Sequence, residues 1–210
     1  MHLPYYNVLS GYTIPDVKEK QGGVCAHITS LAQVEVILTQ YCPHVIPIMK
    51  RLEKLASKGK LRPLHQVCPR DEGRPCAAKY SVDDHWYRAE VLGMEQGRIV
   101  VGFVDFGDME TLSPECVKEI PLDLLILPRA SISCMITGLD LEDIGEENWS
   151  RARAWLVDKV SDKVVKMEVS NFVRDQVACE AKLYADDDET DVASQLKKVL
   201  SERQFVGIDR

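Results

Sequence analysis

The sequence contains no long apolar run: no stretch approaches the roughly 20 consecutive apolar residues that a membrane-spanning helix needs. Its first residues, Met1-His-Leu-Pro-Tyr5, have neither the basic start nor the apolar core of a secretory signal peptide. With 45% hydrophobic and 28% charged residues, the composition is typical of a globular protein in water. We therefore expect a cytoplasmic protein whose 210 residues form one large domain or two small ones that share a core.

The seven cysteines include no C-x-x-C pair, and their spacing matches no zinc motif. An odd number of scattered cysteines is typical of reduced, mostly buried thiols in a reducing compartment. We therefore expect neither a disulfide framework nor a metal site.

Motifs that carry catalysis are also missing. Ser131-Ile-Ser-Cys134 has no nucleophile-elbow pattern, and no histidine lies nearby in sequence to activate Cys134. Asp105-Phe106-Gly107 matches the D-F-G string of protein kinases, but no glycine-rich loop and no H-R-D motif accompany it. No phosphate-cradling motif occurs. We predict that the chain is not an enzyme and needs no cofactor.

Acidic residues outnumber basic ones, and the net charge of −7 is unevenly distributed. Between residues 104 and 149 there are eleven Asp and Glu against Lys118 and Arg129, whereas residues 44–74 carry eight Lys and Arg against three acids. An acidic region attracts a basic partner and repels a phosphate backbone. A merely solvated acidic surface explains the same charges equally well.

Apolar periodicity predicts a mixed α+β chain. Residues 1–20 have no periodicity and are expected to form a loosely tied arm. We expect strands over 24–28, 34–38, 77–81, 86–92, 98–105, 109–112, 130–137, 163–169 and 176–184, and helices over 43–57, 147–158 and 192–200. The four strands between 77 and 112 are joined so tightly that they favour a small, strongly bent barrel.

Aromatic and acidic residues gather in that barrel segment, at Tyr80, Tyr87, Phe103, Phe106 and Asp108. Aromatic faces beside carboxylates hold cations, especially planar ones such as a guanidinium. Because neighbouring strand residues point to opposite faces, the rings can share one rim only if the chain bends near the glycine that follows Phe106. The alternative is that these rings simply fill a small barrel, and Asp108 is then a turn residue.

At these residues the chain resembles a Tudor domain, in Cys76-Ala-Ala-Lys-Tyr80, Trp86-Tyr87-Arg-Ala89 and Phe103-Val-Asp-Phe-Gly-Asp108. Over about 180 residues it resembles an extended Tudor domain. That resemblance implies a five-stranded Tudor barrel inserted into an OB-like, staphylococcal-nuclease-like domain and joined to it by a linker helix. The implied division is a flexible arm over 1–21, the first part of the outer domain with the helix over 22–57, the Tudor barrel over 58–120, and the second part of the outer domain over 121–210.

The resemblance also implies a function, recognition of symmetrically dimethylated arginine in Arg-Gly or Arg-Ala tails. The implied partners are PIWI-type Argonautes in perinuclear germ granules. Tyr80, Tyr87, Phe103 and Phe106 match the four walls of the family's aromatic cage. Asp108 stands where the family usually has Asn, which leaves the preference between methylated and unmethylated arginine open. The nuclease-like part carries no acid–base set that we can match to a nuclease site.

Two other functions remain open at this point. An OB-like fold with exposed aromatics suits single-stranded nucleic acid, although the acidic charge opposes it. The third possibility is a structural adaptor whose cage is not used.

Overall fold

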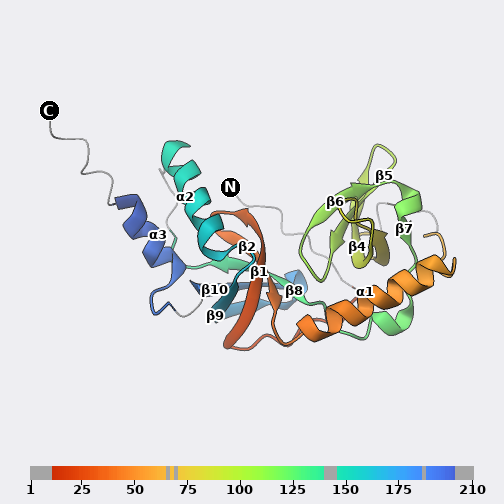
Figure 1. The fold of residues 1–210 in the computed structure, drawn as a ribbon, viewed down its shortest axis with the longest axis horizontal. Coiled ribbons are helices and arrows are strands. Elements are labelled where there is room, and N and C mark those ends of the chain that lie inside the picture. The colour runs from red at the N-terminus through yellow and green to blue at the C-terminus, as the bar shows by residue number, and fades with distance from the viewer. Residues whose placement is uncertain (1–10, 65–66, 69–70, 140–145, 186–187, 202–210) are drawn as a thin grey trace.

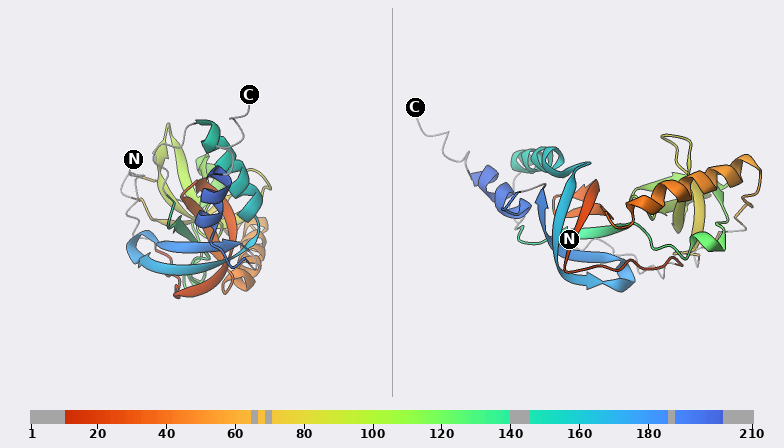
Figure 2. Two further views of the ribbon diagram at one scale, coloured as in Figure 1. Left: turned by 90° about the vertical axis from the view of Figure 1, so that its left-hand side faces the viewer. Right: turned by 60° about the horizontal axis from the view of Figure 1, so that its bottom comes forward.

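Two β units lie side by side along the length of the molecule (Figures 1 and 2). The structure is a computed structural model that describes residues 11–64, 67–68, 71–139, 146–185 and 188–201. One unit is a closed five-stranded barrel, and the other is a five-stranded antiparallel sheet. This arrangement confirms the expected α+β class. Among the described residues, no helix is long and apolar enough to cross a membrane.

The closed barrel is assembled from two parts of the chain that flank the second sheet. Its strand order is β1-β2-β8-β10-β9. The strands are β1 (Lys20–Ser30), β2 (Gln33–Leu38), β8 (Ser131–Ile136), β9 (Val164–Val173) and β10 (Ala178–Ala185). The pairing of β8 with β10 is parallel, and the other pairings are antiparallel. The second sheet is therefore an insertion between β2 and β8.

Alternation of side chains builds the core of this barrel. In β2, Val34, Val36 and Leu38 are fully buried, while the residues between them face outward. The helices α2 (Glu146–Val160) and α3 (Val192–Ser201) cover the barrel, and their Leu156 and Leu196 join its core (Figure 2). These elements agree with the strands and helices that the periodicity predicts.

The second sheet has the order β6-β5-β4-β3-β7. Its strands are β3 (Pro75–Lys79), β4 (Trp86–Glu95), β5 (Arg98–Phe103), β6 (Met109–Leu112) and β7 (Val117–Lys118). Short 3-10 turns lie at η1 (Pro114–Cys116), η2 (Leu122–Leu124) and, in the closed barrel, η3 (Arg174–Gln176). The helix α1 (Cys42–Ser57) packs against β4 and buries Ile48 and Leu52 in a cluster with Ala77 (Figure 1). The two-residue β7 was not predicted, because it is too short to show alternation.

A buried arginine joins the second sheet to the chain that leads back to the closed barrel. Arg88 of β4 is 1% exposed, and its Nε donates to Asp105 Oδ2 at 2.8 Å. Its terminal nitrogens donate to the carbonyl oxygens of Leu124, Leu127 and Pro128. Because these charge-assisted bonds run from β4 to the end of η2 and the residues that follow it, Arg88 holds that segment against the sheet.

The start of the described chain is more firmly held than the loosely tied arm that the sequence predicts. Tyr12 is 3% exposed, and its ring lies 5.2 Å from the guanidinium carbon of Arg88. Its hydroxyl donates toward the carbonyl oxygens of Cys76 and Ala89. The arm therefore reaches the second sheet at residue 12, which the polar composition of residues 1–20 does not reveal.

Candidate functional site

Four aromatic rings converge at one rim of the second sheet. Tyr80 follows β3, Tyr87 lies in β4, Phe103 ends β5 and Phe106 lies in the turn before β6. Ring centroids are 5.2 Å apart for Tyr80 and Phe103, 5.3 Å for Tyr87 and Phe106, 5.9 Å for Tyr87 and Phe103, and 6.1 Å for the two tyrosines. Interplanar angles of 77–89° make every contact edge-to-face, so that the rings stand as the sides of a box.

The rings enclose a cavity of about 210 Å³, which Asp83 and Asp108 complete. We call this cavity, with its four rings and two carboxylates, the aromatic cage. Tyr87 and Phe103 are buried and belong to the core of the sheet, whereas Tyr80 and Phe106 are only partly buried. Two of the rings therefore belong to the core, as the alternative of a filled barrel requires, and the other two are only partly buried.

A tight turn brings Phe106 and Asp108 to this rim. The N–H groups of Phe106 and Gly107 both donate to the carbonyl oxygen of Phe103, at 3.1 and 2.8 Å. Gly107 has φ +88°, and a Cβ at this position would lie 2.6 Å from Cβ of Glu35 in β2. Only glycine combines this backbone angle with such a close approach. The predicted bend near Gly107 is thus present, and the closed barrel presses directly against it.

The phenol groups of the cage remain neutral at physiological pH. Burial, together with the hydrogen bond to Asp83, raises the pKa of Tyr87 well above its ordinary value. Burial also raises the pKa of Tyr80, and the charge of Asp108 acts in the same direction. Burial opposes the ionisation of Asp83, but hydrogen bonds from the Tyr87 hydroxyl and the His85 N–H together lower its pKa. The cage therefore combines uncharged π faces with ionised carboxylate.

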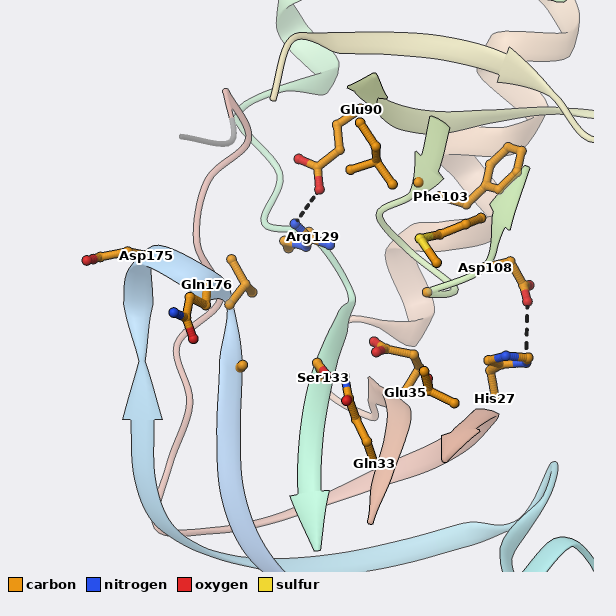
Figure 3. Close-up of a pocket in the computed structure, with 17 residues that line it drawn as sticks. His27, Gln33, Glu35, Glu90, Phe103, Asp108, Arg129, Ser133, Asp175 and Gln176 are labelled. Atoms are coloured by element: carbon orange, nitrogen blue, oxygen red, sulfur yellow. Dashed lines mark hydrogen bonds and ion pairs between the residues drawn. The ribbon is translucent and has the colours of Figure 1, made fainter. Parts of the chain in front are cut away.

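Asp108 stands between the two β units. Its Oδ1 lies 3.7 Å from Nδ1 of His27, which belongs to β1 (Figure 3). The five residues predicted for the site thus come together in one place. Two further residues were missed: Asp83 reads as a turn residue in the sequence, and His27 lies far before the cage segment in the chain. Within the described residues, no group of three or more His, Cys, Asp or Glu is arranged to hold a metal ion.

A family model described as the Tudor domain matches residues 17–138, which is more than half of the chain. Among curated proteins, Tudor domain-containing protein 1 of Mus musculus is 34% identical over 110 residues, which are 52% of this chain and 8% of that protein. A Tudor domain-containing 6-like protein of Xenopus laevis is 36% identical over 98 residues, 46% of this chain and 5% of that protein. The chain thus spans less than a tenth of the length of either relative.

Solved structures share the fold. The human TDRD1 extended Tudor domain, in complex with a symmetrically dimethylated peptide, aligns with a TM-score of 0.74 and 24% identity, over 95% of this chain and 96% of that one. The extended Tudor domain TD3 of mouse TDRD1, in complex with a MILI peptide containing dimethylarginine 45, aligns with a TM-score of 0.75 and 19% identity, over 92% and 96%. From the family match and this agreement over nearly the whole fold, the chain belongs to the Tudor domain family and has the extended Tudor architecture.

Proposed function

We propose that this chain is a non-catalytic peptide-binding module that recognises arginine, including symmetrically dimethylated arginine, in Arg-Gly or Arg-Ala tails. The observation that carries the proposal is the cage itself: four rings in edge-to-face contact around a cavity of about 210 Å³ with carboxylates at its edge. A guanidinium is planar, permanently charged and weakly hydrated, so it loses little when it leaves water for a space between π faces.

Methylation suits such a cage. Dimethylation keeps the positive charge of arginine while it replaces N–H donors by methyl groups. The methyl groups then contact the rings, and the remaining N–H groups find an acceptor in Asp108 at the rim. Each cation–π contact contributes about 0.5–2 kcal/mol, so several rings around one cation give measurable but modest affinity.

The relatives support the choice of partner. Solved extended Tudor domains of similar fold hold a MILI peptide with dimethylarginine, a Piwi N-terminal R10me2s peptide and Aubergine peptides with R13(me2s) or R15(me2s). We therefore propose tails of PIWI-type Argonautes as partners of this chain, in cytoplasmic germ granules. The acidic side chains at the cage argue against a phosphate backbone as the ligand.

The experiment is a titration of a labelled Arg-Gly-Arg-Ala peptide, unmodified and symmetrically dimethylated, into the wild type and Phe106→Ala. Loss of one cage wall is expected to weaken binding at least about tenfold, which corresponds to roughly 1.4 kcal/mol. Trp149→Ala, which removes an exposed ring from α2 outside the cage, is the matched control and is expected to bind like the wild type. Equal binding by the wild type and Phe106→Ala would refute the proposal.

A further inference from the structure

Basic side chains form a row along α1 and the segment that follows it. Between residues 44 and 64 there are six Lys and Arg against one acid, Glu53, although the net charge of the whole chain is −7. Five of the six are exposed and form no ion pair within the described part of the chain: Lys50, Lys54, Lys58, Lys60 and Arg62. We call these five side chains the basic row.

The basic row lies on the side of α1 that faces away from the second sheet. In an α-helix, residues i and i+4 share one face, so Lys50, Lys54 and Lys58 follow one another at a rise of about 6 Å. The opposite face buries Ile48 and Leu52 against the sheet. The helix runs along the outside of that sheet, which leaves the row open to solvent (Figures 1 and 2).

The end of α1 fixes the backbone of the last cations in the row. The N–H groups of Gly59 and Lys60 donate back to the carbonyl oxygens of Ala56 and Leu55, both at 2.9 Å. These two bonds form the Schellman arrangement that commonly ends a helix. Leu61 then joins the buried cluster beneath α1. The row is therefore mounted on a continuous, fixed support.

Nearby carboxylates do not neutralise the row. Glu53 Oε1 accepts a hydrogen bond from the Trp86 N–H at 2.6 Å, so this acid is turned toward the second sheet. The carboxylate of Asp123 pairs with Arg51, at 2.6 Å, rather than with a member of the row. Three lysines elsewhere have carboxylate partners, in the pairs Lys20 with Glu168, Lys79 with Asp84, and Lys159 with Asp188. The row thus keeps its charge available to a partner.

The residue types of this surface favour phosphate over other anionic partners. From residue 50 to 62, every exposed residue is Lys, Arg, Ser or Gly. The cores of protein–protein interfaces are depleted in Lys and enriched in aromatic residues, so an acidic protein fits this surface poorly. The apolar face of α1 is already buried against the sheet, so it is not free to insert into a lipid surface. A basic groove or row that follows a nucleic-acid backbone needs only the charges.

We propose that the basic row binds the phosphate backbone of a single-stranded nucleic acid. A single strand presents one line of phosphates, and the row presents one line of cations. In the helical repeat, Glu53 falls on one side of the row and Arg51, with its partner Asp123, on the other. These carboxylates oppose the second backbone of a duplex. Because the row holds no aromatic ring on which a base could stack, binding is expected to be independent of sequence.

The basic row and the aromatic cage lie on different sides of the second sheet. Neighbouring residues of β4 show the separation, because Trp86 packs in the cluster beneath α1 whereas Tyr87 enters the core below the cage. A strand bound along α1 therefore leaves the cage open. The inference goes beyond the proposed function and does not depend on it.

The test is a titration of the wild type into a fluorescently labelled oligouridylate of about 12 nucleotides, followed by anisotropy. The titration is repeated at salt concentrations between about 50 and 200 mM. If each of the five cations neutralises one phosphate, the logarithm of the association constant falls against the logarithm of the salt concentration with a slope of about −3.5. An oligodeoxythymidylate of the same length is expected to bind alike, because the row contacts phosphates alone.

Variants of the row locate the effect. Replacing Lys50, Lys54 and Lys58 together by Gln is expected to reduce the magnitude of the slope by about 2 and to weaken binding at least about tenfold at the lowest salt. Replacing the same three residues by Arg keeps the charge, so the slope is expected to stay at the wild-type value. Thermal unfolding of each variant verifies that it folds.

The matched control removes the same amount of charge from other parts of the surface. Lys18, Lys182 and Lys197 are exposed lysines outside the row, and their combined replacement by Gln is expected to leave the slope unchanged. Phe106→Ala is expected to bind the oligouridylate like the wild type, since the cage takes no part.

Four outcomes would contradict the inference. Absence of binding at the lowest salt, or equal loss of slope in the row variant and in the control, would overturn the basic row as a binding site. Tighter binding of a duplex of the same length would overturn the preference for a single strand. Tighter binding of oligoglutamate would assign the row to an acidic protein, and tighter binding of phosphatidylserine vesicles would assign it to a membrane surface.

Discussion

At the scale of single residues, Asp108 is the side chain that we expect to set whether the cage prefers methylated or unmethylated arginine. Its carboxylate lines the cage, and its Oδ1 lies 3.7 Å from Nδ1 of His27. A carboxylate only accepts hydrogen bonds, so it gains most from a guanidinium with all its N–H groups. An amide at the same place accepts a bond with less charge attraction, and it therefore loses less when methyl groups replace the donors.

We predict that Asp108→Asn shifts the preference of the cage toward methylated peptide. We expect the dissociation constant of the unmodified peptide, divided by that of the dimethylated peptide, to rise severalfold. The reason is that a charge-assisted hydrogen bond to the unmodified guanidinium becomes a weaker, neutral one. Fluorescence anisotropy with both peptides measures this ratio. Asp84→Asn makes the same change at an exposed turn residue that does not line the cage, where Asn also tolerates the positive φ of 66°. A ratio unchanged by Asp108→Asn would contradict the carboxylate argument.

The residue types that form the cage can be predicted from the sequence, but the charged groups around the cage cannot. Strand parity correctly separates Trp86, which packs toward α1, from Tyr87, which enters the core of the second sheet. Asp83 joins the cage through the Tyr87 hydroxyl, and no local pattern distinguishes such a carboxylate from an ordinary turn residue. Glu35 lies on the outward face of a strand far before the cage turn in the chain, so only the fold brings it there.

At the scale of elements, the turn between β5 and β6 places two of the six cage residues, Phe106 and Asp108. It is fixed from three directions: by its own bonds to Phe103, by β8 through the bond from the Ser131 N–H to the Val104 carbonyl oxygen, and by Glu35 against Gly107. Such a turn holds its side chains without help from a ligand. A rigid cage loses little conformational entropy when the peptide binds.

We predict that Gly107→Ala weakens peptide binding and destabilises the fold. Alanine at φ +88° is strained, and its Cβ would lie 2.6 Å from Cβ and Cγ of Glu35. The expected loss in the free energy of unfolding is about 2–4 kcal/mol, the sum of backbone strain and steric overlap. Urea denaturation and the peptide titration measure the two effects.

Gly97→Ala is the matched control for this change. Gly97 has φ +79°, but no heavy atom lies within 4 Å of a Cβ built there. The Gly97→Ala variant is therefore expected to lose only the free energy of the backbone strain, about 1 kcal/mol of unfolding free energy, with peptide binding unchanged. If the two variants were equally destabilised, the contact between Glu35 and the turn would have no energetic role.

The elements themselves were predictable where their periodicity was long enough. The helix expected over 147–158 is α2 (Glu146–Val160), and the strand expected over 130–137 is β8 (Ser131–Ile136). Sequence alternation cannot reveal β7, whose two residues pair with β3, nor which strands close into the barrel. Closure depends on the parallel contact of β8 with β10, which forms between segments far apart in the chain.

At the scale of the whole molecule, the inserted sheet and the closed barrel depend on shared anchors. Arg88 in the sheet bonds to the segment after η2, and Tyr12 from the start of the described chain covers its guanidinium. The sequence-based division at residues 58 and 120 is still a prediction. It places Tyr12 and the acceptors Leu124, Leu127 and Pro128 outside the inserted part, although all of them contact Arg88 of its strand β4.

The buried arginine leads to the last prediction, that Arg88→Lys uncouples the two units. Lysine offers three donors on a compact ammonium, so it cannot satisfy Asp105 and three carbonyl oxygens at once. Lysine keeps the charge that pairs with Asp105, but each buried acceptor that it leaves without a donor is expected to cost about 1–3 kcal/mol. Hydrogen-exchange mass spectrometry, resolved by segment, is expected to show faster exchange in β3 to β6 and little change in β9 and β10.

Arg98→Lys, at an exposed arginine that donates to the Thr111 carbonyl oxygen, is expected to leave exchange in both units unchanged. Uniformly faster exchange across both units would instead mean that they unfold as one cooperative body, with Arg88 stabilising both equally.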